Sequence, residues 1–177
     1  MKQSAIYENF PLQIVLGCNL VSWSIYAIGA YILARLWLWL LIPYLLYCLG
    51  LEIKLLKEGC VNCAYYGKVC AFGKGKLCAL IFERGDPRRF AAREISWTQV
   101  LPDLLVSLLP LIGGVLFLLQ KGWDWTVVIL SISLLVLASG GTALVRSSFA
   151  CKHCQQRELG CPAEKLFSQE RKFPHES

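Results

Sequence analysis

Histidine and charged residues are scarce in this sequence. Of its 177 residues only two are histidine and 17% are charged, whereas 56% are hydrophobic. This composition excludes a soluble globular domain and predicts an integral membrane protein. Both histidines, His153 and His175, fall outside the long apolar segments. A haem held by two histidines within the bilayer is therefore excluded.

Recognisable catalytic and targeting patterns are also missing. Residues 73–76 contain two glycines and two lysines but lack the G-x4-G-K-[ST] pattern of a nucleotide-binding loop. Residues 1–10 lack the charged, apolar and small-residue regions of a cleaved signal peptide. No constellation of acid, base and nucleophile stands out, which favours a protein that is not an enzyme.

Four apolar segments are long enough to cross a bilayer. They cover residues 11–31, 33–52, 99–119 and 125–145, each near the ~20 residues that span ~30 Å of hydrocarbon. Short turns join the first segment to the second and the third to the fourth. This predicts an all-α membrane protein made of two antiparallel hairpins, with the lipid bilayer as a partner. Pro43 lies inside the second segment and is expected to kink that helix.

Basic residues are unevenly distributed along the chain. Of the 18 lysines and arginines, nine lie in residues 54–93, six in residues 146–172, and one is Lys2. Only Arg35 and Lys121 lie in the two short turns. The positive-inside rule then predicts that both termini and the central loop are cytoplasmic, with the protein in the plasma (cytoplasmic) membrane.

Six of the nine cysteines form two strings with identical spacing. The pattern C-x2-C-x6-C begins at Cys60 and again at Cys151, 91 residues later. The same offset superimposes the two hairpins and brings Pro11 onto Pro102. We therefore predict a tandem duplication, with residues 1–90 as the first repeat and residues 91–177 as the second. Because each repeat contains an even number of spans, a pseudo-twofold axis along the membrane normal would place both cysteine-rich arms on one face.

The two arms are candidates for a metal centre. Clustered thiols in a reducing compartment are more often metal ligands or redox groups than structural disulfides. Each arm supplies three sulfurs, one short of a closed tetrahedral site. Either Cys78 completes a first site and His153 or His175 a second, or the arms share one six-sulfur site. Cys18 and Cys48, inside the first hairpin, are expected to be packing residues. The candidate ligands are Cys60, Cys63, Cys70, Cys78, Cys151, Cys154, Cys161 and His153.

The paired spacing resembles that of the binuclear zinc cluster family of fungal DNA-binding domains. In that family six cysteines hold two zinc ions, and two of the sulfurs bridge the metals. The resemblance covers residues 60–70 and 151–161 and implies a similar six-sulfur ligand geometry. Because two membrane spans separate the halves here, the DNA-binding function is not carried over and no nucleic-acid partner is expected.

Three functions follow from the thiols. The favoured one is a cytoplasmic cysteine-ligated metal site that is structural or recruits a cytoplasmic or membrane protein partner. Zinc is preferred over an iron–sulfur cluster because the spacing matches neither bacterial nor plant-type ferredoxins. The alternative is an iron–sulfur or thiol–disulfide subunit that transfers electrons for a membrane oxidoreductase. The third is a soft-metal chaperone or uptake component, since thiolates bind copper(I) and mercury.

Overall fold

Four long helices dominate the protein. The computed structural model describes residues 6–91, 97–157, 159 and 161, and the regular secondary structure of these residues is helical, with no strand. Four helices are long and apolar enough to cross a membrane: Leu12–Leu36, Leu38–Asn62, Val100–Lys121 and Trp125–His153. The expectation of an all-α integral membrane protein with four spans is confirmed.

Two spans are single α-helices and two are assembled from several helical pieces. The first span is α1 (Leu12–Leu36) and the third is α5 (Trp97–Lys121). The second comprises a 3-10 turn (Leu38–Leu40), α2 (Leu41–Lys54), a π-helical turn (Leu55–Gly59) and a 3-10 turn (Cys60–Asn62). The fourth comprises α6 (Trp125–Val136), a π-helical turn (Leu137–Gly141), α7 (Thr142–Leu144), a π-helical turn (Val145–Ala150) and a 3-10 turn (Cys151–His153). Between the second and third spans lie α3 (Lys74–Ile81) and α4 (Pro87–Ala91).

The second and fourth helices continue beyond the ends expected from hydropathy. They reach Asn62 and His153, whereas the apolar segments end near residues 52 and 145. Hydropathy predicts where a helix leaves the hydrocarbon, but the helical hydrogen bonding of the backbone continues beyond that point. Consequently Cys60 and Cys151 lie on the last turns of membrane-spanning helices rather than in separate loops.

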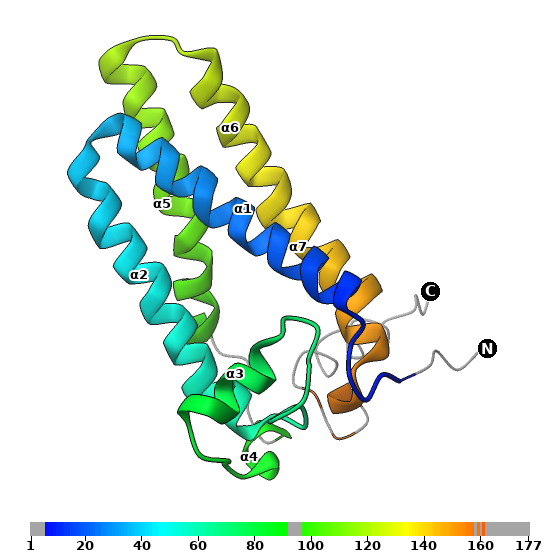
Figure 1. The fold of residues 1–177 in the computed structure, drawn as a ribbon. Helices are drawn as coiled ribbons and strands as arrows, with labels where there is room; N and C mark the ends of the chain where they lie inside the picture. Colours follow the sequence, from blue (N-terminus) through cyan, green and yellow to red (C-terminus); the bar gives the residue numbers. More distant parts are fainter. Residues whose placement is uncertain (1–5, 92–96, 158, 160, 162–177) are drawn as a thin grey trace, which may run out of the picture.

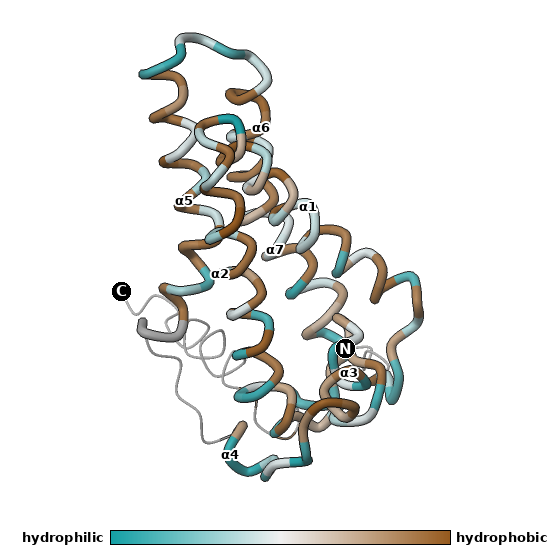
Figure 2. The backbone as a smooth tube through the Cα atoms, turned by 60° about the vertical axis from the view of Figure 1, so that its left-hand side comes forward, coloured by the Kyte–Doolittle hydropathy of each residue, from teal (hydrophilic) through white to brown (hydrophobic). Residues whose placement is uncertain are grey.

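The hairpins pack closely because α5 carries two adjacent glycines. A Cβ atom on Gly113 would lie 2.7 Å from a Leu33 methyl group, and one on Gly114 would lie 2.7 Å from the Ser131 hydroxyl. The missing side chains let α1 and α6 approach α5 on both sides, as small residues do between membrane helices. Apolar residues cover the four spans and polar residues mark the connections (Figure 2).

Two prolines occupy different positions in their helices and so differ in their effect on backbone hydrogen bonding. Pro43 lies in the first turn of α2, directly after a 3-10 turn, where a missing amide costs little. Pro43 thus lies inside the second span, as expected, but close to its beginning, where a kink is not required. Pro110 lies deep inside α5 and cannot donate to the Val106 carbonyl four residues earlier. The buried Tyr44 hydroxyl of α2 donates to that carbonyl instead, at 3.0 Å.

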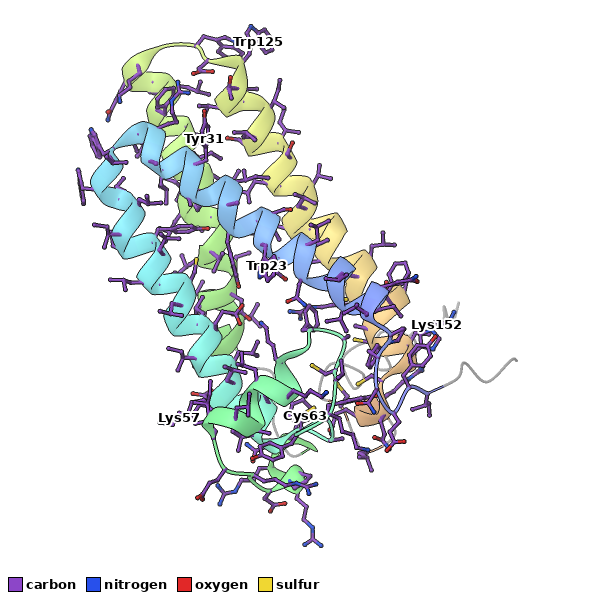
Figure 3. All side chains as sticks on the ribbon, in the orientation of Figure 1. Trp23, Tyr31, Lys57, Cys63, Trp125 and Lys152 are labelled. Carbon is purple, nitrogen blue, oxygen red and sulfur yellow. The ribbon has the colours of Figure 1, made fainter. Side chains whose placement is uncertain are left out.

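The two short turns meet at one end of the bundle. The Arg35 guanidinium lies 2.7 Å from the Asp124 carboxylate, and the Lys121 ammonium donates to the carbonyls of Arg35 and Leu36 at 3.2 and 3.1 Å. The Thr126 amide also donates to Asp124 and, with Arg35, holds the pKa of this carboxyl below its usual range. Polar bonds thus join the hairpins at the end opposite the cysteine-rich arms (Figures 1 and 3).

Candidate metal centre

The two C-x2-C strings adopt the same local structure. In each, a π-helical turn leads into a 3-10 turn that begins at the first cysteine. The Cys63 amide donates to the Cys60 carbonyl at 3.2 Å, and the Cys154 amide donates to the Cys151 carbonyl at 3.3 Å. Cys63 and Cys154 both leave the helix in extended conformation, with φ of −85° in each case. The turn brings the two cysteines of each string near one another.

Backbone amides also point at the second sulfur of each string. The Tyr65 amide donates to the Cys63 sulfur, and the Gln156 amide donates to the Cys154 sulfur. These donors favour thiolate, the metal-binding form. Burial acts in the opposite direction and is the larger effect, so the pKa of Cys63 is raised and that of Cys154 is raised to about 12. Without a metal both groups are therefore neutral thiols at physiological pH.

The two arms, defined as residues 60–78 and residues 151–161, are joined by a reciprocal pair of hydrogen bonds. The Ala64 amide donates to the Gln156 side-chain oxygen at 2.8 Å, and the Gln155 amide donates to the Tyr65 hydroxyl at 3.0 Å. Ala64 and Gln155 are 91 residues apart, as are Tyr65 and Gln156. In each arm, one residue donates its backbone amide to the other arm, and the following residue accepts with its side chain. The Tyr65 and Gln156 residues are 1% and 2% exposed, so this contact is shielded from water.

The N-terminal segment, residues 7–10, lies across both arms. The Tyr7 amide donates to the His153 carbonyl of the second arm at 3.1 Å, and the Tyr7 carbonyl accepts from Tyr65 of the first arm at 2.6 Å. The Phe10 amide donates to the Val69 carbonyl at 2.9 Å. The His153 ring packs against the Tyr7 ring with their centroids 4.8 Å apart. This histidine therefore takes part in holding the N-terminal segment on the arms.

Four thiols gather in the first arm. Cys60 lies within electrostatic range of Cys70, Cys78 and Cys63. Cys78 comes from α3, is fully buried, and donates its thiol hydrogen to the Leu56 carbonyl at 3.6 Å. The helix can approach because of Gly75, where a Cβ atom would clash with the Tyr65 carbonyl oxygen. Cys78, the predicted fourth ligand of this arm, therefore lies within electrostatic range of Cys60.

Thiols of the two arms meet at Cys63. Its sulfur interacts electrostatically with Cys70 of its own arm and with Cys154 and Cys161 of the other. Cys154 in turn interacts with Cys151 and Cys161. Sulfur atoms accordingly lie around the labelled Cys63, between the first arm and the end of the fourth span (Figure 3). Thiols of the two arms thus lie within electrostatic range of one another.

The described cysteine sulfurs are not arranged as a metal coordination shell. Within the described part of the chain, no group of three or more His, Cys, Asp or Glu side chains is placed so that it could hold a metal ion. The donor set still suits a soft metal, because it is rich in sulfur and receives backbone amides. His175, the other candidate histidine, lies outside the described residues.

The structure adds residues that the cysteine pattern did not indicate. Tyr65 and Gln156 make the contact between the arms, and their shared 91-residue offset was the available signal. Glu52 on α2 accepts from the Tyr26 hydroxyl at 2.8 Å and pairs with Lys74 at the start of α3. Cys18 is buried in an apolar cluster that includes Cys70, and the two thiols interact.

Comparison of the chain with protein-family models, curated proteins and solved structures finds no match.

Proposed function

We propose that this integral membrane protein carries a cytoplasmic zinc centre, built from the two arms, that locks its halves together and presents a docking surface to a protein partner. The observation that carries the proposal is the reciprocal bond pair between Ala64 and Gln156 and between Gln155 and Tyr65. It brings two cysteine strings, separated by two membrane spans, into one buried contact. Shared ligation across that contact would join the halves of the chain.

We also propose that the halves, residues 1–90 and 91–177, arose by tandem duplication and are related by a pseudo-twofold axis. Support comes from paired features at one offset: the π-helical and 3-10 turns, the amide-to-sulfur contacts and the exchanged bonds. An exchange in which each partner gives and receives the same kind of bond is typical of a twofold contact. The excess of basic residues near the arms supports a cytoplasmic position for them and for the termini.

The proposed ligands are the seven arm cysteines, with His153 as a further candidate. Cys63 lies within electrostatic range of Cys70 in its own arm and of Cys154 and Cys161 in the other, which supports one shared site over two separate ones. Zinc suits this set because it binds thiolate without redox chemistry and accepts four sulfur ligands. Structural zinc contributes ~10–16 kcal/mol in small domains, whereas one hydrogen bond contributes ~1 kcal/mol. The metal would therefore dominate the contact that the two exchanged bonds position.

Elemental analysis of the full-length protein tests the proposal, with purification under anaerobic, reducing conditions. We expect zinc in a whole-number ratio to protein and no visible absorption. The variant Cys63→Ser should lose most of the metal, because its sulfur lies within electrostatic range of thiols from both arms. Cys48→Ser is the matched control, since Cys48 is buried in the bundle beside Tyr44 and outside the arms.

The same preparation separates the alternatives. A metal-free wild-type protein with reduced thiols refutes the proposed centre, as does equal metal loss in the Cys63→Ser and Cys48→Ser variants. A brown protein that contains iron and sulfide supports instead the electron-transfer subunit. Reversible disulfide formation in metal-free protein supports a thiol redox role, and weakly held copper(I) supports a chaperone.

A further inference from the structure

The short helix α3 has one buried face and one apolar face that the protein leaves uncovered. Its buried face carries Gly75 and Cys78, which pack against the first arm. The other face carries Leu77, Leu80 and Ile81, which are 47%, 84% and 58% exposed. The spacing i, i+3, i+4 places these three side chains on one stripe of the helix. Burial of Cys78 fixes the direction in which this stripe points.

The helix begins beside the last part of the second span that lies in the hydrocarbon. Lys74, its first residue, pairs with Glu52 in the last turn of α2. At 1.5 Å per residue, Glu52 lies about 21 Å along the span from Leu38, about 9 Å short of the ~30 Å thickness of a bilayer core. On the other side, the Asn19 amide group in α1 donates to the Phe72 carbonyl at 3.2 Å. Contacts with two spans therefore hold the start of α3 just inside the expected edge of the hydrocarbon, beside the end of α2 (Figure 1).

Exposed cations surround this apolar stripe. Lys76 flanks it on α3 itself, and Lys54 and Lys57 lie on the adjoining end of the second span. Arg84, Arg88 and Arg89 follow in the next 10 residues of the chain and are also exposed. A short helix with an exposed apolar stripe and with cations on the adjoining segments suits binding to an anionic membrane surface.

We propose that α3 is an interfacial helix that inserts Leu77, Leu80 and Ile81 into the anionic leaflet surrounding the bundle. The bilayer is the occupant of this face because contacts with two membrane spans hold the start of the helix just inside the expected edge of the hydrocarbon. The surrounding lysines and arginines select anionic headgroups by charge. The contact concerns lipid and not the thiols, so it holds whether or not the arms bind a metal.

Photo-crosslinking of the full-length protein in liposomes tests this assignment. The variant Leu80→p-benzoylphenylalanine places the probe at the most exposed of the three positions. Ile129→p-benzoylphenylalanine, on α6 and 58% exposed, is the control for a side chain that faces lipid. Leu159→p-benzoylphenylalanine, 57% exposed in the second arm, is the control for an exposed leucine away from α3. Intact mass spectrometry identifies the adducts in vesicles of phosphatidylcholine with or without phosphatidylglycerol.

We expect lipid adducts at positions 80 and 129 and none at position 159. Replacing phosphatidylglycerol by phosphatidylcholine should lower the yield several-fold at position 80 and leave it unchanged at position 129. Absence of a lipid adduct at position 80 while position 129 reacts overturns the proposal. Adducts of position 80 with a second protein chain also overturn it, and equal yields in the two lipid mixtures overturn the selection of anionic headgroups.

Discussion

The hydrogen bond between Tyr44 and the Val106 carbonyl predicts a specific coupling with Pro110. The proline deprives this carbonyl of its helical partner, and the Tyr44 hydroxyl replaces it at 3.0 Å. Tyr44 is only 3% exposed, so water cannot take over the bond. We expect Tyr44→Phe to destabilise the protein in the presence of Pro110 and to have much less effect in Pro110→Ala, where the new amide can bond to Val106.

The expected magnitude follows from burial and from the apolar surroundings. Leaving a buried carbonyl unpaired costs ~1–3 kcal/mol, while hydrogen bonds measured between membrane helices average ~0.6 and reach ~1.7 kcal/mol. We therefore expect Tyr44→Phe to lower the free energy of unfolding by ~1–2 kcal/mol. In the Pro110→Ala background the loss should fall below ~0.5 kcal/mol, since the carbonyl regains a helical bond.

Reversible denaturation in detergent micelles, followed by far-ultraviolet circular dichroism, measures all four members of this double-mutant cycle. The double-mutant cycle subtracts the direct effect of Pro110→Ala on stability. Such an effect is expected because the Pro110 ring packs near Gly29. Equal losses from Tyr44→Phe in the two backgrounds would refute the reasoning, because the hydroxyl would then have another role. A loss confined to the proline background supports it.

Three further predictions concern the arms and the opposite end of the bundle. Gly75→Ala should destabilise the first arm by up to ~3 kcal/mol through overpacking. The control Gly50→Ala, with no atom within 4 Å of the new Cβ, should be neutral or stabilising in thermal denaturation. Similar melting temperatures for the two variants would contradict this. Gln156→Leu should lower the free energy of unfolding by ~1–3 kcal/mol, because a buried amide of the first arm loses its acceptor. It should also weaken zinc binding in chelator competition. Unchanged zinc affinity would contradict a role for the hydrogen bonds between the arms in zinc binding. Asp124→Asn should leave thermal stability nearly unchanged, since the partly exposed pair with Arg35 is weak; a large fall in melting temperature would show that the pair matters more.

Hydropathy predicted the spans well because each depends on local composition. A bilayer requires every spanning segment to satisfy its backbone internally, so a long apolar run in this chain can only be a helix. The same reasoning could not locate the ends at Asn62 and His153, because a helix can continue after it leaves the hydrocarbon. It also selected Pro43 as the disruptive proline, whereas the freed carbonyl lies before Pro110 and its donor comes from another helix.

The sequence by itself determined the four-span helical class and the two matched cysteine strings. Both depend only on the type and order of residues that are close together in the sequence. Only the tertiary structure decided that Gln156 and Tyr65 exchange bonds with the opposite arm, and that Cys63 lies within electrostatic range of thiols from both arms. These contacts join residues about half the chain apart, so they depend on how the hairpins pack and not on any local pattern.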